Sequence, residues 1–414
     1  MSLKLYNSLS RRKEPLILDR GATVKMFVCG PTVYDYAHLG HARTYVAFDI
    51  IARYLKFLGY DVRYLMNITD VADRIVQRAE QLQRDALGLA KEYEKFFLED
   101  MEAIGISSVE RYFRASEHIT EMIGQVTGLI NKGLAYETST GVYFEVKKFP
   151  KFGQLSGLNQ EELGLRRLEL CSSKKNPEDF SLWRKHDSGL KWNSAWGLGR
   201  PGWHVEDTAI AMTNLGETYD IHGGASELMF PHHEAEIAQA EALSGKAPYV
   251  RFWLHTGLLS VKGRKMSKSL GNVIRIRDAL KQYTAQELRY YLASYHYRQP
   301  VGISDAGLKR ARKKVTALNE NIRAFSGSEP GKCKGNRREP DALILRAEGT
   351  FRHHMDNDFD TPRALAFLTA LSGKLANLAK RQRNLDQKSK QNLDLAFRRM
   401  ADVFGILPQF EPSN

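Results

Sequence analysis

The clearest pattern of apolar and polar positions lies near the N-terminus, over residues 23–66. Residues 23–28 and 62–66 are short apolar runs rich in β-branched and aromatic side chains, which predicts two buried strands. Between them, apolar residues over 42–58 recur at helical spacing, and Gly59 follows the last one. The pattern therefore predicts a strand, a long loop, a helix and a second strand, as in an α/β protein with a parallel sheet.

Helical and strand-like patterns continue along the rest of the chain. Helices are predicted over residues 73–104, 116–133, 228–243 and 276–326, with a further apolar segment over 204–212. A hairpin is predicted over 134–146, with its turn at 139–141, and a strand or strand pair over 253–261. Residues from 147 to about 200 are irregular and polar, so we interpret them as part of an insertion without a separate core.

These patterns divide the chain into segments. Residues 327–341 have the glycine, serine, proline and charge content of a flexible linker, and two or three amphipathic helices follow as a small bundle. The segments are a first half of a nucleotide-binding domain over 1–115, an inserted segment over 116–199, a second half over 200–275, a helical segment over 276–326, the linker and the bundle over 342–414.

Charge suggests a polyanionic partner. The chain has 414 residues, with 61 Lys and Arg against 48 Asp and Glu, a net charge of +13. Nucleic acid is the leading candidate, although an ordinary basic surface is the alternative. Cys29, Cys171 and Cys333 are too few for a disulfide framework. With no secretory signal and no apolar run of the ~18 residues that a membrane span needs, we expect a cytoplasmic protein without membrane contact.

The loop at residues 29–41 carries the first candidate chemistry. It contains Cys29, His38, Gly40 and His41 and leads into the predicted helix. Free N–H groups and the dipole at a helix start favour phosphate. No GxGxxG or Walker sequence occurs here, so the common dinucleotide and P-loop sites are not supported. A capped helix with two polar histidines is the alternative interpretation.

A lysine-rich loop at residues 263–272 is the second candidate. Its lysines, two serines and flanking glycines suit it to gripping phosphates. His38-Leu-Gly-His41 and Lys265-Met-Ser-Lys-Ser269 together resemble the two signatures of class I aminoacyl-tRNA synthetases. The resemblance implies a Rossmann-like catalytic domain that binds ATP with Mg²⁺. It implies catalytic roles for His38, His41, Lys265 and Lys268, and ATP contacts from His38, His41, Lys268, Gly40, Gly223 and Gly224.

Five further segments resemble the cysteinyl-tRNA synthetase family. They are residues 27–36, 175–183, 199–206, 220–224 and 230–236, and the resemblance extends from about residue 3 to about 405. It implies an amino-acid pocket at Gly30, Thr32, Thr69, Trp203 and His204. It also implies a zinc ion that binds the substrate thiolate, with matching ligands at Cys29, His232 and Glu236. Without the resemblance, Cys29 could be a core cysteine and His232 a phosphate contact.

The fourth metal position departs from the family, because Asp207 stands where the family has a second cysteine. A carboxylate keeps the formal charge and can bind zinc, but it is a harder ligand than a thiolate. Two outcomes are open. Either zinc binds less tightly and still captures a thiolate, or the pocket has changed its amino acid or lost its metal.

The C-terminal part of the sequence bears on which molecule would accept the activated amino acid. Asp358–Pro362 resembles the family's tRNA-contacting bundle, and basic residues at 309–314 and 374–390 would contact the tRNA backbone. Bacterial members continue into an anticodon-reading module, whereas this sequence stops at Asn414, so we expect a weaker anticodon contact. The leading function is cysteine activation and transfer to tRNA by a monomer. The alternatives are a ligase that joins cysteine or another amino acid to a small amine, as in mycothiol synthesis, and a non-catalytic tRNA-binding paralogue.

Overall fold

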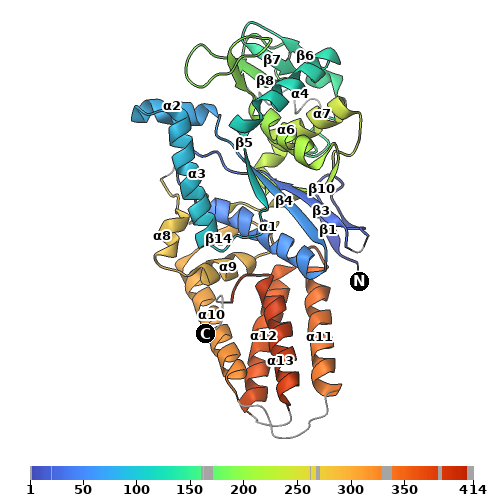
Figure 1. Cartoon of the computed structure of the whole chain (residues 1–414), viewed down its shortest axis with the longest axis vertical. Helices are drawn as coiled ribbons and strands as arrows, with labels where there is room; N and C mark the ends of the chain where they lie inside the picture. The colour runs from blue at the N-terminus through green and yellow to red at the C-terminus, as the bar shows by residue number, and fades with distance from the viewer. Residues whose placement is uncertain are drawn as a thin grey trace.

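A parallel sheet forms the centre of the computed structural model, which describes residues 2–19, 21–159, 162, 171–261, 263–266, 271–328, 338–380 and 385–407. Its strands lie in the order β11, β10, β3, β4, β5, and each neighbouring pair is parallel (Figure 1). The strands are β11 (Val250–Thr256), β10 (Tyr219–Ala225), β3 (Thr23–Val28), β4 (Asp61–Ile68) and β5 (Arg111–Arg114). The predicted α/β fold class is confirmed.

The helix α1 (Leu39–Phe57) connects β3 to β4, as the apolar spacing predicts. Its Phe48 and Ile51 are buried in one cluster with Val24, Met26 and Val28 of β3. Burying such side chains stabilises the unit by roughly 1.5–3 kcal/mol each. This packing fixes the start of α1, and therefore His38, above the carboxyl end of β3.

Among the parts of the fold that were not predicted are a central strand and the first hairpin. The strand β10, which lies between β11 and β3, reads Tyr-Asp-Ile-His-Gly-Gly-Ala, with few of the residues that favour strands. The first residues, expected to be only an entry segment, form an antiparallel hairpin of β1 (Lys4–Asn7) and β2 (Arg12–Pro15). Long-range packing, rather than local preference, determines both.

The predicted helix over 73–104 is in fact two helices. The helix α2 (Asp73–Leu82) ends at Gln83, whose φ of 53° is left-handed, and α3 (Ala86–Ala103) begins after Asp85. The Asp85 side chain accepts a hydrogen bond from the Gly88 N–H, as an N-cap does. The predicted helix over 228–243 likewise begins later than expected, as α7 (Glu234–Ser244).

The inserted segment has a hydrophobic core, so our interpretation of it as lacking one is wrong. Its antiparallel sheet has the order β6 (Ala135–Glu137), β7 (Gly141–Phe144), β8 (Phe180–Lys185), β9 (Gly199–Pro201), which confirms the predicted hairpin of β6 and β7. Phe144, Phe180 and Trp183 are fully buried in a cluster separate from that of α1. The short apolar run of β8 is hidden between long polar stretches.

Three further helices cover this sheet and join it to the parallel one. They are α4 (Ile119–Asn131), which follows a 3₁₀ turn at Ala115–His118, α6 (Trp203–Leu215) and α7. The helix α6 accounts for the apolar segment predicted over 204–212. Figure 1 shows this region at the opposite end of the molecule from the C-terminal helices.

A small sheet and two helices follow β11. The sheet consists of β12 (Leu259–Val261), β13 (Arg264–Lys265) and β14 (Val301–Ile303). Two strands, β11 and β12, cover the residues predicted as a strand or strand pair over 253–261, but they lie in different sheets. The strand β14 interrupts the segment over 276–326 that was predicted to be helical. The helices are α8 (Ile276–Leu280) and α9 (Ala285–Ala293). The long helix α10 (Asp305–Ser326) then leads towards the C-terminal part.

The predicted C-terminal bundle is confirmed. It consists of α11 (Arg338–Met355), α12 (Thr361–Lys380) and α13 (Gln387–Asp402), which pack against one another, and α12 and α13 also pack against α10. Residues 329–337 of the predicted linker lie outside the described residues, and the segment boundaries stay a prediction. Within the described ranges, every helix is too short or too polar to cross a membrane.

Candidate active site

The main cavity lies at the carboxyl ends of β3 and β10, where open parallel sheets bind ligands. Its volume is about 260 Å³, and the start of α1 forms one wall. Of the residues expected in the site, seven line this cavity: Cys29, Gly30, Thr32, His38, Gly40, His41 and Trp203. The structure thus brings the phosphate-binding and amino-acid-binding predictions into one space.

His38 and His41 form a reciprocal cap at the start of α1. The His41 N–H donates to His38 Nδ1, and the His38 N–H donates to His41 Nδ1, both at 3.3 Å. The rings stack with centroids 3.9 Å apart. Because both Nδ1 atoms accept, each neutral ring carries its proton on Nε2, as a donor. A side chain at Gly40 would meet the His38 ring at 2.9 Å, so this turn requires glycine.

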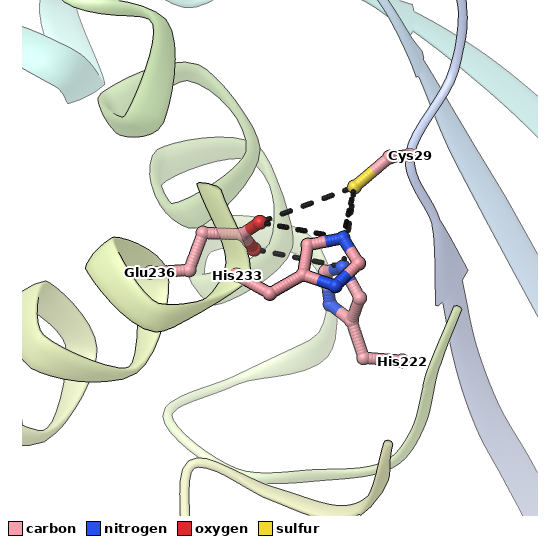
Figure 2. A group of neighbouring side chains, drawn as sticks. All are labelled: Cys29, His222, His233 and Glu236. Atoms are coloured by element: carbon pink, nitrogen blue, oxygen red, sulfur yellow. Dashed lines mark hydrogen bonds and ion pairs between the residues drawn. The ribbon is translucent and has the colours of Figure 1, made fainter. Parts of the chain in front are cut away.

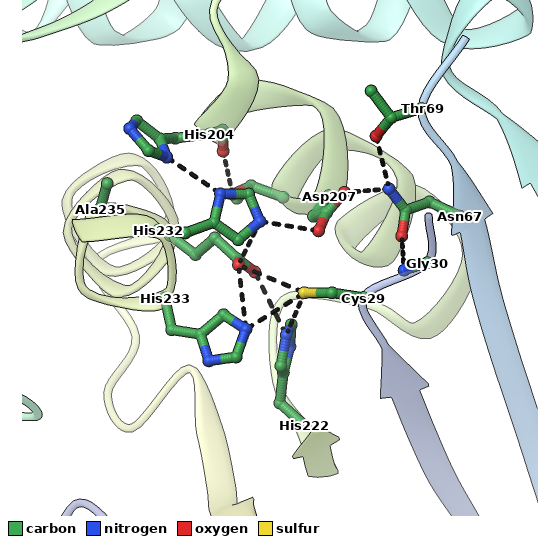
Figure 3. Close-up of polar contacts among 12 residues, drawn as sticks. Cys29, Gly30, Asn67, Thr69, His204, Asp207, His222, His232, His233 and Ala235 are labelled. Carbon is green, nitrogen blue, oxygen red and sulfur yellow. Dashed lines mark hydrogen bonds and ion pairs between the residues drawn. The ribbon is translucent and has the colours of Figure 1, made fainter. Parts of the chain in front are cut away.

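The four expected metal ligands converge behind this cavity. The donor atoms of Cys29, Asp207, His232 and Glu236 all lie within 4.8 Å of one another (Figure 3). His232 Nε2 lies 2.9 Å from Asp207 Oδ2 and 3.3 Å from Glu236 Oε1, and Cys29 Sγ lies 3.9 Å from Glu236 Oε1. Cys29 follows β3, and Asp207 lies on α6. His232 lies in the short helical segment Met229–His233, and Glu236 lies in the first turn of α7, which follows it.

Two further histidines approach Cys29 that sequence reasoning did not identify as site residues. Cys29 Sγ lies 3.3 Å from His222 Nε2 and 3.1 Å from His233 Nε2 (Figure 2). The other ring nitrogens are held by Tyr219 Oη at 2.5 Å and by His255 Nε2 at 2.8 Å. With Glu236 they form a second group of potential metal ligands around the same sulfur. For His233, the sequence did offer one indication, because it directly follows the expected ligand His232.

The charges of this cluster favour a cation. Asp207 and Glu236 are almost fully buried, and Glu236 Oε2 has no hydrogen-bond partner. Burial and the nearby carboxylates raise the pKa of the Cys29 thiol, and burial and Asp207 raise the pKa of Glu236. Thiolate, imidazole and carboxylate are the ligands of zinc, and a divalent cation would favour the charged forms of these groups. The residues present therefore fit the metal.

Trp203 and His204 contact His232, one of the expected metal ligands, from one side. The Trp203 ring stacks on the His232 ring with centroids 4.2 Å apart, and His204 Nδ1 lies 3.0 Å from His232 Nδ1. Burial lowers the pKa of His204, which keeps this imidazole neutral. Trp203 reaches the cavity, whereas His204 is buried behind it and acts on the pocket through His232.

Thr69, Gly223 and Gly224 lie beside the cavity rather than in its wall. Thr69 is buried, and its hydroxyl accepts from the amide of Asn67. A side chain at Gly223 would meet the Phe48 ring at 2.1 Å, and one at Gly224 would meet the His233 ring at 2.9 Å. These glycines admit close packing, and the next residue, Ala225, lines the cavity.

The lysines of the second signature lie at the limit of the described residues. The backbone of Lys265 belongs to β13, beside Met266, which lines the cavity. Lys268 lies outside the described residues. The roles of both lysines stay predictions.

Comparison with known families decides the assignment. Residues 17–313 match the family model of the tRNA synthetases class I (C) catalytic domain, and residues 350–408 match the DALR domain. The chain belongs to the class I (C) tRNA synthetase family. This confirms the resemblance predicted from the sequence motifs.

Among similar proteins of this family are three cysteine–tRNA ligases. That of Thermococcus onnurineus is 43% identical over 99% of this chain and 87% of its own length. That of Pyrococcus abyssi is 44% identical, with the same coverage. That of Heliobacterium modesticaldum is 42% identical over 90% of this chain and 79% of its own length.

Solved class I synthetases share the fold of this family member. Methionyl-tRNA synthetase of Mycobacterium tuberculosis, in complex with methionyl-adenylate, superposes with a TM-score of 0.66 at 16% identity and covers 93% of this chain and 90% of its own. A leucyl enzyme from Agrobacterium radiobacter K84 superposes with a TM-score of 0.69 at 12% identity, covering 93% and 83%. At these identities the likeness supports the fold alone.

The synthetase has a basic face on α10, next to the DALR region. Leu308, Ala311, Val315 and Leu318 are buried against the bundle, while the intervening basic residues face outwards. The exposed residues are Lys309, Arg310, Arg312, Lys313 and Lys314. Over residues 374–390 the basic side chains differ in exposure. Lys374 is exposed, whereas Lys390 is buried and donates to the Ser326 carbonyl at 3.0 Å.

Proposed function

We propose that this chain is a cysteine–tRNA ligase. It would activate cysteine with ATP to form cysteinyl-adenylate and then transfer the cysteinyl group to tRNA. The observation that carries the proposal is the buried group of Cys29, Asp207, His232 and Glu236 directly behind the cavity where His38 and His41 cap α1. The identity of this chain to cysteine–tRNA ligases, over nearly all of its length, supports cysteine as the amino acid and tRNA as the acceptor.

The amino-acid side of the site would select a thiol. Cys29, Asp207, His232 and Glu236 would hold Zn²⁺, which when bound supplies a Lewis acid for the substrate thiolate. Trp203 packs on His232 and keeps that imidazole in place. Sulfur binds zinc better than a hydroxyl oxygen does, so this arrangement would favour cysteine over serine.

The ATP side would work by positioning and by charge. The Nε2 protons of His38 and His41 are donors suited to phosphate oxygens, and the N-terminus of α1 favours their negative charge. Lys265 and Lys268, with Mg²⁺, would stabilise the leaving pyrophosphate. Holding the cysteine carboxylate in line with the α-phosphate would supply the entropic part of the catalysis.

Transfer of cysteine to tRNA tests this function directly. Purified protein is incubated with ATP, Mg²⁺, labelled cysteine and total tRNA, and acid-precipitable label is counted. We expect charging that depends on ATP and tRNA. Lys268→Ala should slow adenylate formation by raising its activation free energy by roughly 2–4 kcal/mol, the usual effect of removing a group that stabilises charge in a transition state.

Two outcomes would contradict the proposal. Charging of tRNA with a different amino acid would reassign the pocket. Label appearing in a small-molecule amide, with no label in tRNA, would instead favour the amine-ligase alternative. The DALR match at the C-terminus and the exposed basic residues of α10 favour tRNA.

A further inference from the structure

Asp207 differs from a cysteine in having two donor atoms. A thiolate offers the metal a single sulfur. A carboxylate can bind through one oxygen or both, and rotation of the side chain can exchange the oxygen that binds. A single well-defined ligand atom therefore requires that the second oxygen be held elsewhere. The contacts of Asp207 show how this is achieved.

Asn67 holds the second oxygen of Asp207. Asn67 is the penultimate residue of β4, and its Nδ2 donates to Asp207 Oδ1 (Figure 3). The same Nδ2 donates to Thr69 Oγ1 at 3.3 Å. Both Asn67 and Asp207 are 1% exposed, so water cannot easily replace this contact.

The orientation of the Asn67 amide is fixed by a third contact. Its Oδ1 accepts a hydrogen bond from the Gly30 N–H at 2.6 Å. Because a backbone N–H can only donate, the oxygen must face Gly30 and the NH₂ group must face Asp207. A side chain at Gly30 would lie 1.7 Å from the backbone carbonyl oxygen of Asn67, so the two segments are locked in close contact.

The other oxygen, Asp207 Oδ2, faces the metal ligands. It lies 2.9 Å from His232 Nε2, the ring nitrogen that also lies 3.3 Å from Glu236 Oε1. His232 Nδ1 is engaged by His204, so Nε2 is the ring atom directed at the two carboxylates. The two oxygens of Asp207 are thus divided, Oδ1 to the amide and Oδ2 to the cluster.

We propose that Asn67 is a positioning residue that makes Asp207 a metal ligand through Oδ2 alone, in a centre with one protein thiolate instead of two. This inference rests on the metal site of the proposed function. The centre would combine Cys29 with one imidazole and two carboxylates. The substrate cysteine would then supply the second thiolate at the metal, in addition to that of Cys29.

Cobalt binding to the full chain tests this inference. Co²⁺ replaces zinc in tetrahedral sites, and its thiolate charge-transfer absorption reports the number of Co–S bonds. Metal-stripped wild type, Asn67→Ala, Asp207→Cys and the double variant are titrated with Co²⁺ against a competing chelator. Far-UV circular dichroism and thermal unfolding show that each variant is folded, and if Asn67→Ala is not, Asn67→Ser is used in its place.

We expect Asn67→Ala to weaken Co²⁺ binding by about 10- to 100-fold, the usual effect of losing a group that orients a ligand. In the Asp207→Cys background, Asn67→Ala should weaken Co²⁺ binding by less than about threefold, since a thiolate has no second oxygen to hold. Charge-transfer absorption should be about twice as intense in Asp207→Cys as in wild type. Cys29→Ser should abolish it in the wild-type background.

Each contrary result has a distinct meaning. An equal loss in both backgrounds would show that Asn67 acts through Gly30 and the Cys29 loop, and would overturn the inference. Unchanged Co²⁺ affinity in Asn67→Ala would overturn it as well. If wild type binds no Co²⁺, the metal site of the proposed function fails, and this inference fails with it.

Discussion

At the scale of single residues, the site depends on buried acidic groups that, among the described residues, pair with histidines rather than with Lys or Arg. Cys29, Asp207 and Glu236 lie together, and Glu236 Oε2 has no hydrogen-bond partner. A carboxylate buried in this way is costly unless a cation or a proton accompanies it. The metal would therefore contribute to the stability of the fold as well as to the selection of the substrate.

The metal content of Asp207→Ala tests the role of this residue. Removing a ligand leaves three donors, so we expect the zinc-to-protein ratio from elemental analysis to fall well below that of wild type. Glu121→Ala is the matched control, because Glu121 is exposed on α4. An unaltered ratio in Asp207→Ala would remove Asp207 from the ligand set.

His255 allows a prediction about pH. Burial lowers the pKa of His255 to about 3. The unfolded chain has a histidine pKa near 6.5, so below that value the unfolded state binds the extra proton and stability is lost as the pH falls. From pH 7.5 to pH 5, metal-free wild type should lose about 2 kcal/mol relative to His255→Gln.

Urea unfolding of both metal-free proteins at the two pH values measures this difference. The comparison with His255→Gln cancels the titration of groups that do not interact with His255; His222 and His233 do interact with it, so the difference includes their response. A difference between the two proteins that does not change with pH would contradict the neutral state of His255.

At the scale of elements, the close approach of β10 to α1 positions the site. Gly223 faces the ring of Phe48, and the neighbouring strands of β10 carry Cys29 on one side and His255 on the other. An added methyl group at Gly223 would overlap the ring at 2.1 Å. The position of β10, and with it that of His222, therefore depends on the absence of a side chain there.

Gly223→Ala should destabilise the protein by about 1–3 kcal/mol, as overpacking of a core usually does. Phe48→Leu in the same chain should recover part of this loss, because the smaller side chain leaves room for the methyl group. The free energies come from urea unfolding of the two single variants and the double variant. Additive effects would mean that the two residues do not meet.

The same elements show what could be predicted from the sequence. The strand β3, the helix α1 and the strand β4 were predicted because local periodicity matches burial there. The strand β10 was missed because its glycines and polar residues are favoured only by long-range packing. His222 and His233 were missed as site residues for a similar reason, since they lie 193 and 204 positions from Cys29 in the chain. Asp207, His232 and Glu236 were recognised through motifs, not through any local pattern.

At the scale of the whole molecule, a buried aspartate joins the bundle to the catalytic part. Asp358 follows α11 with a φ of 62°, and its carboxylate accepts from the Tyr6 N–H, the Tyr297 hydroxyl and Arg298. These groups come from β1 and from the segment before β14. Asp358 thereby ties the segment between α11 and α12 to β1 and to the residues before β14.

Salt dependence measures the contribution of α10 to tRNA binding. Replacing Lys309, Lys313 or Lys314 by Ala should weaken binding and reduce the slope of log K against log salt by about 1 for each phosphate that the variant no longer neutralises. Lys246→Ala is the matched control, because Lys246 is exposed just after α7, outside α10 and the C-terminal helices, and pairs with Glu217. An unchanged slope in all three α10 variants would place the tRNA elsewhere.

Amino-acid-dependent exchange of pyrophosphate into ATP, without tRNA, tests the central claim most directly. The metal-loaded protein is assayed with each proteinogenic amino acid in turn, including serine as the oxygen analogue of cysteine. We predict exchange with cysteine and only background exchange with serine and the others. No exchange with any amino acid, or faster exchange with an amino acid other than cysteine, would contradict the assignment.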